Sequence, residues 1–183
     1  MSKGKKIGVG VIALVLLVVA IVAIVAVRHV MYVKQLSTVR IEKRDGVTRY
    51  IGAEGVSFYS MVDTPNKVYT LMNTEGDTDA YQIAHQIYVI DKKTGKMNEF
   101  YDTGYSKWSF SGVAQIFGDG RYLGWEERTA DNVSTVKVYD LDSGKVVANL
   151  KDMELADFYK IVDDTLHWKE QDNKAKSVRL NGN

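Results

Sequence analysis

The sequence predicts an all-β soluble domain, built of propeller-like blade repeats or folded as a β-sandwich, behind one N-terminal transmembrane helix. Three observations support this prediction. Residues 7–27 are only Ile, Val, Leu, Ala and Gly. The remainder consists of short runs that alternate between apolar and polar residues, separated by turn residues, as is typical of strands. A hairpin motif also occurs twice, at a spacing of about 49 residues, and periods of this length indicate repeat architectures.

The apolar stretch 7–27 is long enough to cross a bilayer as a helix, because at about 1.5 Å per residue it spans ~31 Å. Its many Val and Ile residues favour a strand, but a lone strand in lipid leaves backbone groups unpaired, so a helix is expected. The run is longer than a signal-peptide core and lacks a good cleavage pattern, which indicates an uncleaved anchor. We therefore expect a short basic cytoplasmic head at 1–6, a transmembrane helix at 7–27, a juxtamembrane extension at 28–37 and a β-rich domain at 38–183.

The orientation of this anchor follows from its short head. Basic residues flank the span on both sides, at positions 3, 5 and 6 before it and at 28, 34, 40, 43 and 44 after it. A plain count of these charges favours a cytoplasmic C-terminal side, but long domains cross largely regardless of charge. We expect a single-pass protein of the cell membrane, in contact with the lipid bilayer, with a cytoplasmic N-terminus and an extracytoplasmic β domain.

After residue 37 the hydrophobic period changes from helical to alternating, and no further amphipathic helix is expected. The alternation and the turn residues between the runs predict about a dozen short strands. They are expected at 39–41, 47–51, 56–62, 67–72, 86–90, 97–101, 113–117, 121–127, 135–139, 146–150, 156–162, 166–170 and 177–180.

The repeated motif is Asp-x-x-Thr/Ser-Gly-Lys, at 91–96 and again at 140–145. Each copy lies between two predicted strands. Its aspartate can accept hydrogen bonds from the backbone two residues on, and its glycine can take the positive φ that closes a bulged hairpin. We expect both motifs to be tight hairpin turns.

These two loops resemble the blade hairpins of quinoprotein-type β-propeller repeats, in which Asp-x-x-Thr-Gly-Lys joins the two outer strands of a blade. Propellers typically have four to eight blades, whereas this sequence holds three copies at most. The strands 39–41 and 47–51 could complete the last copy by joining first to last, without making a fourth blade. Quinoprotein blades carry a tryptophan four residues after the glycine, where Glu99 and Ala148 stand here, so no quinone or other cofactor is expected. An open propeller-like array, a piece completed by another subunit and a β-sandwich all remain possible.

Composition excludes several functions. The 24 basic and 23 acidic side chains give a net charge of +1, whereas nucleic-acid-binding proteins usually carry a clustered basic surplus. The absence of cysteine excludes disulfides, thiolate metal sites and cysteine nucleophiles. No nucleic-acid partner is therefore expected.

No residue cluster has the spacing of a metal site or a catalytic triad. The three histidines are isolated in the sequence, and two acidic turns lack the further oxygen ligands that calcium requires. These residues are His29, His85 and His167, and the acidic sets Glu75, Asp77 and Asp79, and Asp140 and Asp142. We expect no metal, no catalytic residues and no enzymatic activity.

Two features remain as candidate sites. The aromatic residues Tyr101, Tyr105 and Trp108 are typical of grooves that bind peptides or glycans, although rings of this kind more often belong to a core. Asn132 begins an Asn-Val-Ser sequence that matches a glycosylation acceptor.

These features together predict a membrane-anchored interaction module, an accessory or assembly subunit that binds a partner protein or an envelope polymer. One alternative is a structural subunit of a filament or oligomer packed through its N-terminal helix. Another is an enzyme with a site that the sequence does not reveal.

Overall fold

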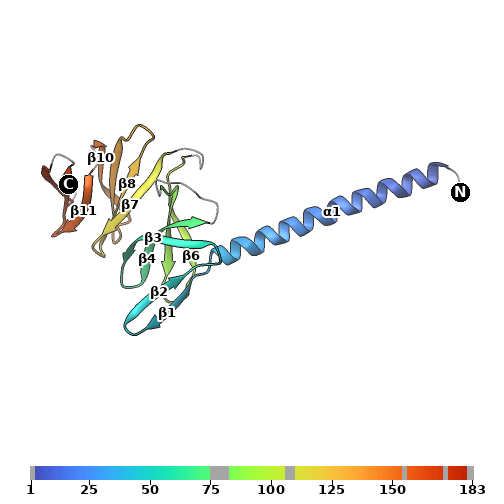
Figure 1. Cartoon of the computed structure of the whole chain (residues 1–183), viewed down its shortest axis with the longest axis horizontal. Helices are drawn as coiled ribbons and strands as arrows, with labels where there is room; N and C mark the ends of the chain where they lie inside the picture. Colours follow the sequence, from blue (N-terminus) through green and yellow to red (C-terminus); the bar gives the residue numbers. More distant parts are fainter. Residues whose placement is uncertain (1–2, 75–82, 106–109, 154–155, 171–172, 181–183) are drawn as a thin grey trace. The chain divides into compact units, whose positions relative to one another are not determined.

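A computed structural model of the chain (Figure 1) describes all residues except 1–2, 75–82, 106–109, 154–155, 171–172 and 181–183, and it leaves the side chains of 3–14, 29, 32–33, 35, 74 and 157 undescribed. The chain forms two compact units, Met1–Ser37 and Thr38–Asn183. The first is helical, and the second, called the β unit below, is built from antiparallel strands.

The N-terminal unit is the helix α1 (Lys3–Leu36), whose described side chains are mostly apolar and more than half exposed. Among the described residues, no helix is both long and apolar enough to cross a membrane. This finding corrects the prediction of a transmembrane helix at 7–27, together with the membrane localisation and orientation derived from it.

The β unit confirms the prediction of an all-β domain. Its strands match the predicted runs to within a few residues, because the alternating pattern and the turn residues mark them clearly. They are β1 (Arg40–Arg44), β2 (Val47–Ile51), β3 (Val56–Asp63), β4 (Lys67–Thr74), β5 (Gln86–Asp91), β6 (Met97–Asp102), β7 (Gly112–Gly118), β8 (Tyr122–Arg128), β9 (Ser134–Asp140), β10 (Lys145–Met153), β11 (Ala156–Val162), β12 (Thr165–Glu170) and β13 (Ala175–Arg179).

These strands form four antiparallel sheets that follow one another along the chain. β1 and β2 form the N-terminal hairpin, β3 to β6 the first sheet, β7 to β10 the central sheet and β11 to β13 the third sheet. Each sheet is a meander in which every strand pairs with the next one in sequence. No sheet within the described residues closes into a propeller, and the prediction that the first strands complete the last copy is wrong, because β1 pairs with β2 instead.

The sheets pack on one another through three apolar clusters. Leu71 and Ile87 of the first sheet share a cluster with Leu123 and Trp125 of the central sheet. The opposite face of the central sheet packs on the third sheet, and the N-terminal hairpin covers the outer face of the first sheet. The central sheet is thus covered on both faces, and in Figure 1 its strands lie between β3 to β6 and β11.

The two repeated turns have the predicted structure. In the first copy, Asp91 Oδ1 accepts hydrogen bonds from the backbone amides of Lys93 (3.0 Å) and Thr94 (2.8 Å), and Gly95 has a φ of 69°. The corresponding Gly144 in the second copy has a φ of 70°. A left-handed backbone favours glycine, which explains this part of the motif.

Gly95 has a second reason to lack a side chain. A Cβ atom there would lie 2.3 Å from the carbonyl oxygen of Val39, whose amide donates a hydrogen bond of 2.8 Å to Gly95 O. The first copy of the turn therefore also holds the start of the N-terminal hairpin against the first sheet.

Candidate functional site

The candidate site is a cleft between β6 of the first sheet and β8 to β10 of the central sheet. It has a volume of about 310 Å³ and is called the aromatic cleft below. Its lining residues are Phe100, Tyr101, Trp125, Lys137, Tyr139, Val146 and Asn149. Pockets for small molecules usually measure about 300–1,000 Å³, so the cleft can hold a group the size of one large side chain.

A β-bulge in β6 builds the aromatic wall of this cleft. Ile87 pairs with Tyr101, but the next residue, Tyr88, pairs with Glu99, so that Phe100 is an extra residue in the ladder. Successive residues of a regular strand point to opposite faces, and a bulge removes that alternation locally. Phe100 and Tyr101 therefore both reach the central sheet.

The rings meet edge to face or tilted. Phe100 has its ring centroid 5.3 Å from that of Tyr139 and 6.5 Å from that of Trp125, with interplanar angles of 87° and 90°. The ring of Tyr101 lies 4.8 Å from that of Trp125 at 45°. Aromatic pairs in such geometries contribute about 0.5–1.5 kcal/mol each beyond the area that they bury. The rings that form the wall of the cleft therefore stabilise one another without a ligand.

Three polar residues along this wall, Lys137, Tyr101 and Glu127, are called the cleft triad below. Lys137 Nζ donates hydrogen bonds to the hydroxyl of Tyr101 and to Glu127 Oε1, both at 2.8 Å. The Tyr101 hydroxyl donates in turn to Glu127 Oε1 at 2.8 Å, and the same oxygen accepts a hydrogen bond of 2.9 Å from Trp125 Nε1. An ammonium group has three donors, so within the described part of the chain one donor of Lys137 remains for a ligand.

The electrostatics of the triad keep Lys137 charged. Burial opposes its charge, but the hydrogen bonds to Glu127 and Tyr101 outweigh burial and raise the pKa of Lys137. Burial raises the pKa of Tyr101 as well. At neutral pH the cleft therefore presents an ammonium and a neutral phenol, which suits the binding of a carbonyl or carboxylate more than attack by a neutral lysine.

The structure places the predicted ligand-binding residues differently. Tyr101 lines the cleft, Tyr105 is 37% exposed and lies three residues after the end of β6, and Trp108 lies outside the described residues. The sequence reasoning missed Lys137 and Glu127. A lysine within an alternating strand and a glutamate two residues after a tryptophan give no signal of pairing until the sheets are stacked.

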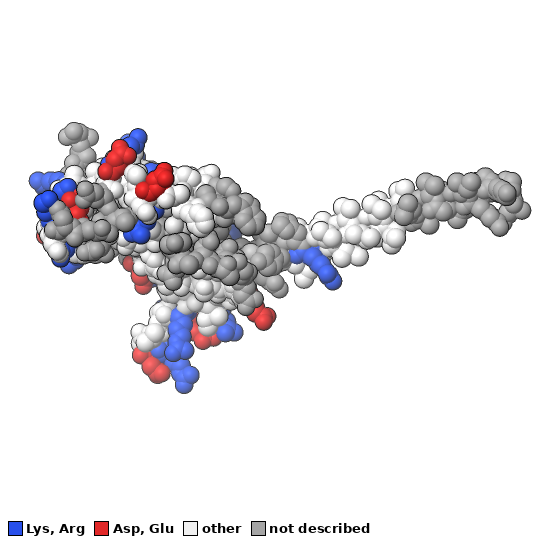
Figure 2. Space-filling view, turned by 45° about the horizontal axis from the view of Figure 1, so that its top comes forward, with Lys and Arg blue, Asp and Glu red and all other residues white. Residues whose placement is uncertain are grey.

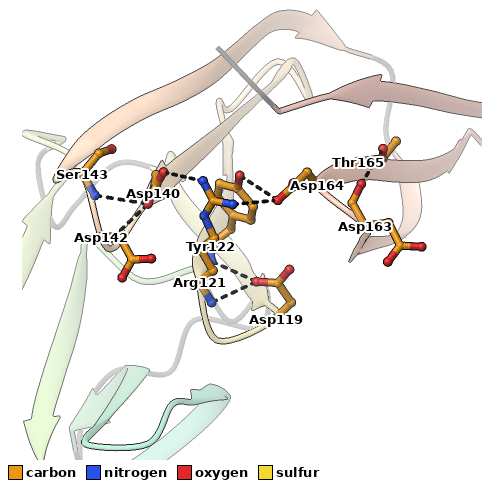
Figure 3. A network of polar contacts seen from close by, with 9 residues as sticks. All are labelled: Asp119, Arg121, Tyr122, Asp140, Asp142, Ser143, Asp163, Asp164 and Thr165. Carbon is orange, nitrogen blue, oxygen red and sulfur yellow. Dashed lines mark hydrogen bonds and ion pairs between the residues drawn. The ribbon is translucent and has the colours of Figure 1, made fainter.

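A second polar cluster joins the hairpin turns at one edge of the central and third sheets (Figure 3). Arg121 contacts Asp140 Oδ2 through Nη2 at 3.4 Å and Asp164 Oδ1 through Nη1 at 3.1 Å. The hydroxyl of Tyr122 donates to the same oxygen of Asp164 at 3.0 Å, and Asp119 accepts from the backbone amides of Arg121 and Tyr122. These contacts tie a turn of the central sheet to a turn of the third sheet.

This cluster accounts for one of the acidic turns weighed as a calcium site. Burial alone would raise the pKa of Asp140, but hydrogen bonds from the backbone amides of Asp142 and Ser143 and the charge of Arg121 lower it. The carboxylate is therefore engaged in its own turn. The other acidic set, at 75, 77 and 79, lies outside the described residues, and no group of described side chains could hold a metal ion.

The remaining candidates are dispersed. Among the histidines, His85 has a buried Nδ1 without a described partner, His167 is exposed in β12, and the side chain of His29 is not described. Asn132 is exposed on the turn between β8 and β9, with a φ of 60°. Its glycosylation stays a prediction.

Comparisons with known proteins do not assign a family. No family model and no curated protein matches this chain. Among solved structures, a similar chain is described as "a putative 6-phosphogluconolactonase" from Bacteroides uniformis, at 14% identity and a TM-score of 0.46. The match covers 78% of this chain and 44% of that chain, so this chain spans less than half the length of that protein.

This comparison corrects the prediction that the chain is not an enzyme. The similar chain carries the name of an enzyme, so the comparison does not bear out that prediction. At this TM-score and identity, however, the likeness carries no argument about activity, and no substrate is taken from it.

Proposed function

We propose that the β unit is an interaction module that binds an extended segment of a partner protein through the aromatic cleft. The observation that carries this proposal is the pairing of a preformed aromatic wall with a fixed ammonium in a cleft of about 310 Å³. A volume of this size suits the side chain of one anchoring residue, and interfaces concentrate their binding energy on such aromatic and charged anchors.

The chemistry of the cleft defines the segment. Phe100 and Tyr139 offer ring faces and edges to an aromatic or large aliphatic side chain. The remaining donor of Lys137 suits a carboxylate or a backbone carbonyl next to that side chain. We therefore expect a bulky apolar residue beside an acidic residue.

The face-to-face packing of the sheets also supports a proposal for their overall arrangement. Meanders that follow one another in sequence and pack face to face support a propeller-like array of blades, as the resemblance to quinoprotein-type repeats implies. In such an array the cleft lies between the outer strands of neighbouring blades, where a partner segment can enter.

Selection of peptides displayed on phage against the purified full-length chain tests this function. Selected sequences should share a bulky apolar residue next to Asp or Glu. Their affinity should be lost in Val146→Trp, because a tryptophan at this 51% exposed position would fill the cleft. Val47→Trp is the matched control, since Val47 is 56% exposed on the N-terminal hairpin.

Three results would contradict the proposal. One is selection of peptides with no common sequence, and another is equal binding by the two tryptophan variants. The third is preferential binding of oligosaccharides from a glycan array with the same sensitivity to Val146→Trp, which would assign the cleft to the predicted polymer instead of a protein.

A second candidate function is an oligomer packed through α1. Its described apolar side chains include Leu16, Val22 and Val25, which are 64%, 61% and 60% exposed. Exposed apolar surface on this scale usually marks an interface. Sedimentation of the full-length chain should show a concentration-dependent oligomer that Val22→Lys disrupts, and a monomer at every concentration would exclude this function.

A further inference from the structure

The third sheet has one strand fewer than its neighbours. Among the described residues, the first and central sheets each have four strands, and the third has three, β11, β12 and β13. In the described residues no strand pairs with the free edge of β13. Unpaired backbone groups along such an edge are a template for another strand.

The position next to β13 faces side chains that are only partly buried. On the first sheet, the fourth strand supplies Phe100 and Tyr101, which pack against the central sheet. On the other side of the central sheet, β10 directs Ala148, Leu150 and Met153 towards the third sheet, where they remain partly buried. A fourth strand beside β13 would cover these apolar groups, in the same way that β6 covers the opposite face of the central sheet.

The outer face of the third sheet carries positive charge. The register of its ladders places nine residues on this face, and none of them is acidic. They are Phe158, Lys160, Val162, Thr165, His167, Lys169, Ala175, Ser177 and Arg179. In Figure 2 Lys and Arg side chains gather at the end of the β unit where Figure 1 shows β11.

These charges restrict what the edge can receive. Two copies paired through β13 would bring two basic faces together, and like charges oppose such pairing. Lysine and arginine at an edge protect natural proteins from pairing with themselves in this way. An acidic strand meets the opposite situation, since its carboxylates would lie on the same face as Arg179 of β13 and Lys169 of the next strand, β12.

We propose that the open edge of β13 receives an extended acidic segment of a partner protein as the fourth strand of the third sheet. Its apolar side chains point towards Leu150 and Met153 of the central sheet, and its acidic side chains lie on the outer face. Main-chain hydrogen bonds give the affinity, and the alternating side chains give the specificity, as in other cases of strand addition. This surface is independent of the aromatic cleft, because Val146 lies on the opposite face of β10.

A fluorescent peptide of alternating Val and Glu, about eight residues long, is a suitable probe for the full-length chain. Binding measured by fluorescence anisotropy should be saturable, and a peptide of alternating Val and Lys should not bind. The double variant Lys169→Glu/Arg179→Glu should bind the acidic probe about tenfold more weakly. The matched control is Lys43→Glu/Arg49→Glu on the N-terminal hairpin, which should bind normally.

Backbone pairing is tested separately from charge. Two further probes carry N-methyl groups, one on every Val nitrogen and the other on every Glu nitrogen. At least one of them should lose binding, because it lacks the N–H groups that face β13. The cleft variant Val146→Trp should bind the unmethylated probe as well as the unmodified chain does, which separates this proposal from the proposed function.

Four results would overturn the proposal. The first is no binding of the acidic probe up to about 1 mM. The second is equal binding by the two double variants. The third is full binding of both N-methylated probes, which would leave only surface attraction. The fourth is tighter binding of a short polyphosphate with the same loss in Lys169→Glu/Arg179→Glu, which would assign the face to a polyanion.

Discussion

Glu126 and Glu127 are neighbours in β8, yet their side chains reach opposite faces of the central sheet. Glu126 is completely buried and accepts hydrogen bonds from Arg128, Gln115 and Ser134, which occupy both of its oxygens. Glu127 faces the aromatic cleft, where Lys137 keeps 22% of its side chain exposed. The Glu126 carboxylate is buried and fully hydrogen-bonded, whereas the Glu127 carboxylate binds a lysine that lines the aromatic cleft.

The difference shows that buried charge on this sheet serves two purposes. A satisfied network fixes one packing of two sheets and leaves no donor for a ligand. A network that ends at a cleft holds a charged group in place and leaves part of its capacity unused. The network on the face of the central sheet towards the third sheet is therefore complete. The network on the face towards the first sheet keeps a donor of Lys137, which the proposed recognition of a partner segment would use.

The largest effect is expected for Glu126→Leu. Removal of this carboxylate leaves Arg128 without its buried partner, and breaking such a pair costs about 3–5 kcal/mol of unfolding free energy. Glu127→Gln should cost only about 1–2 kcal/mol, because an acceptor oxygen remains and Lys137 reaches water. Urea unfolding measures both changes, and equal losses would remove the distinction between the two faces.

A smaller effect is expected for Ser60→Ala, which tests how the first sheet is joined to the central sheet. Ser60 lies at a bulge in β3 with a φ of 51°. Its Oγ donates to Ile116 O at 3.2 Å and accepts from Ile116 N at 3.0 Å. Loss of both bonds should lower the unfolding free energy by about 1–2 kcal/mol.

The control for Ser60→Ala is Ser57→Ala, because Ser57 is exposed on the same strand. Ser57→Ala should leave the urea midpoint nearly unchanged. A similar loss in both variants would mean that the bulge does not join the sheets.

Tyr159→Phe should stabilise the protein, in contrast to Tyr101→Phe. The Tyr159 hydroxyl is buried without a described hydrogen-bond partner, so its removal should add about 1 kcal/mol at neutral pH. The Tyr101 hydroxyl bonds to Glu127, and its removal should cost about the same amount. Thermal unfolding of the two variants at neutral pH compares the two hydroxyl groups directly. Shifts of the melting temperature with the same sign would contradict the view that one hydroxyl is unpaired and the other is hydrogen-bonded.

Tyr159 also predicts how the stability of the protein changes at alkaline pH. Burial, with a further effect of the Glu126 carboxylate, raises the pKa of Tyr159 well above its ordinary value of 10.0. The folded state then resists ionisation of this hydroxyl, so the stability of the protein does not depend on its titration below pH 10 and falls as the pH rises from 10 through the folded pKa. Tyr159→Phe should unfold less readily above pH 10, and an unchanged alkaline profile would contradict this.

The smallest effect is expected for Arg121→Gln at the turns that join the central and third sheets. The Arg121 side chain is 47% exposed, and exposed ion pairs contribute about 0–1 kcal/mol. The urea midpoint should therefore change little and should lose its dependence on salt. A loss as large as that of Glu126→Leu would show that the turns, and not the buried network, hold these sheets together.

Much of the fold could be predicted from the sequence, because its strands and turns depend on local patterns. The alternation of residues located the strands, and Asp91 and Gly95 determined a turn through contacts within a few residues. The cleft depends on contacts between distant segments. The bulge at Phe100 and the pairing of Lys137 with Glu127 arise only when two sheets are stacked, so alternation and spacing could not reveal them.

The most direct test of the recognition face is a titration of the full-length chain, labelled with ¹⁵N, with a peptide selected on phage. The account predicts that amide shifts concentrate on β6 and on the cleft-lining residues of β8 to β10, with Lys137 and Val146 among them. Strands β11 to β13 should remain unchanged. Shifts centred on the Glu126 side of the sheet, or spread evenly over the β unit, would contradict it.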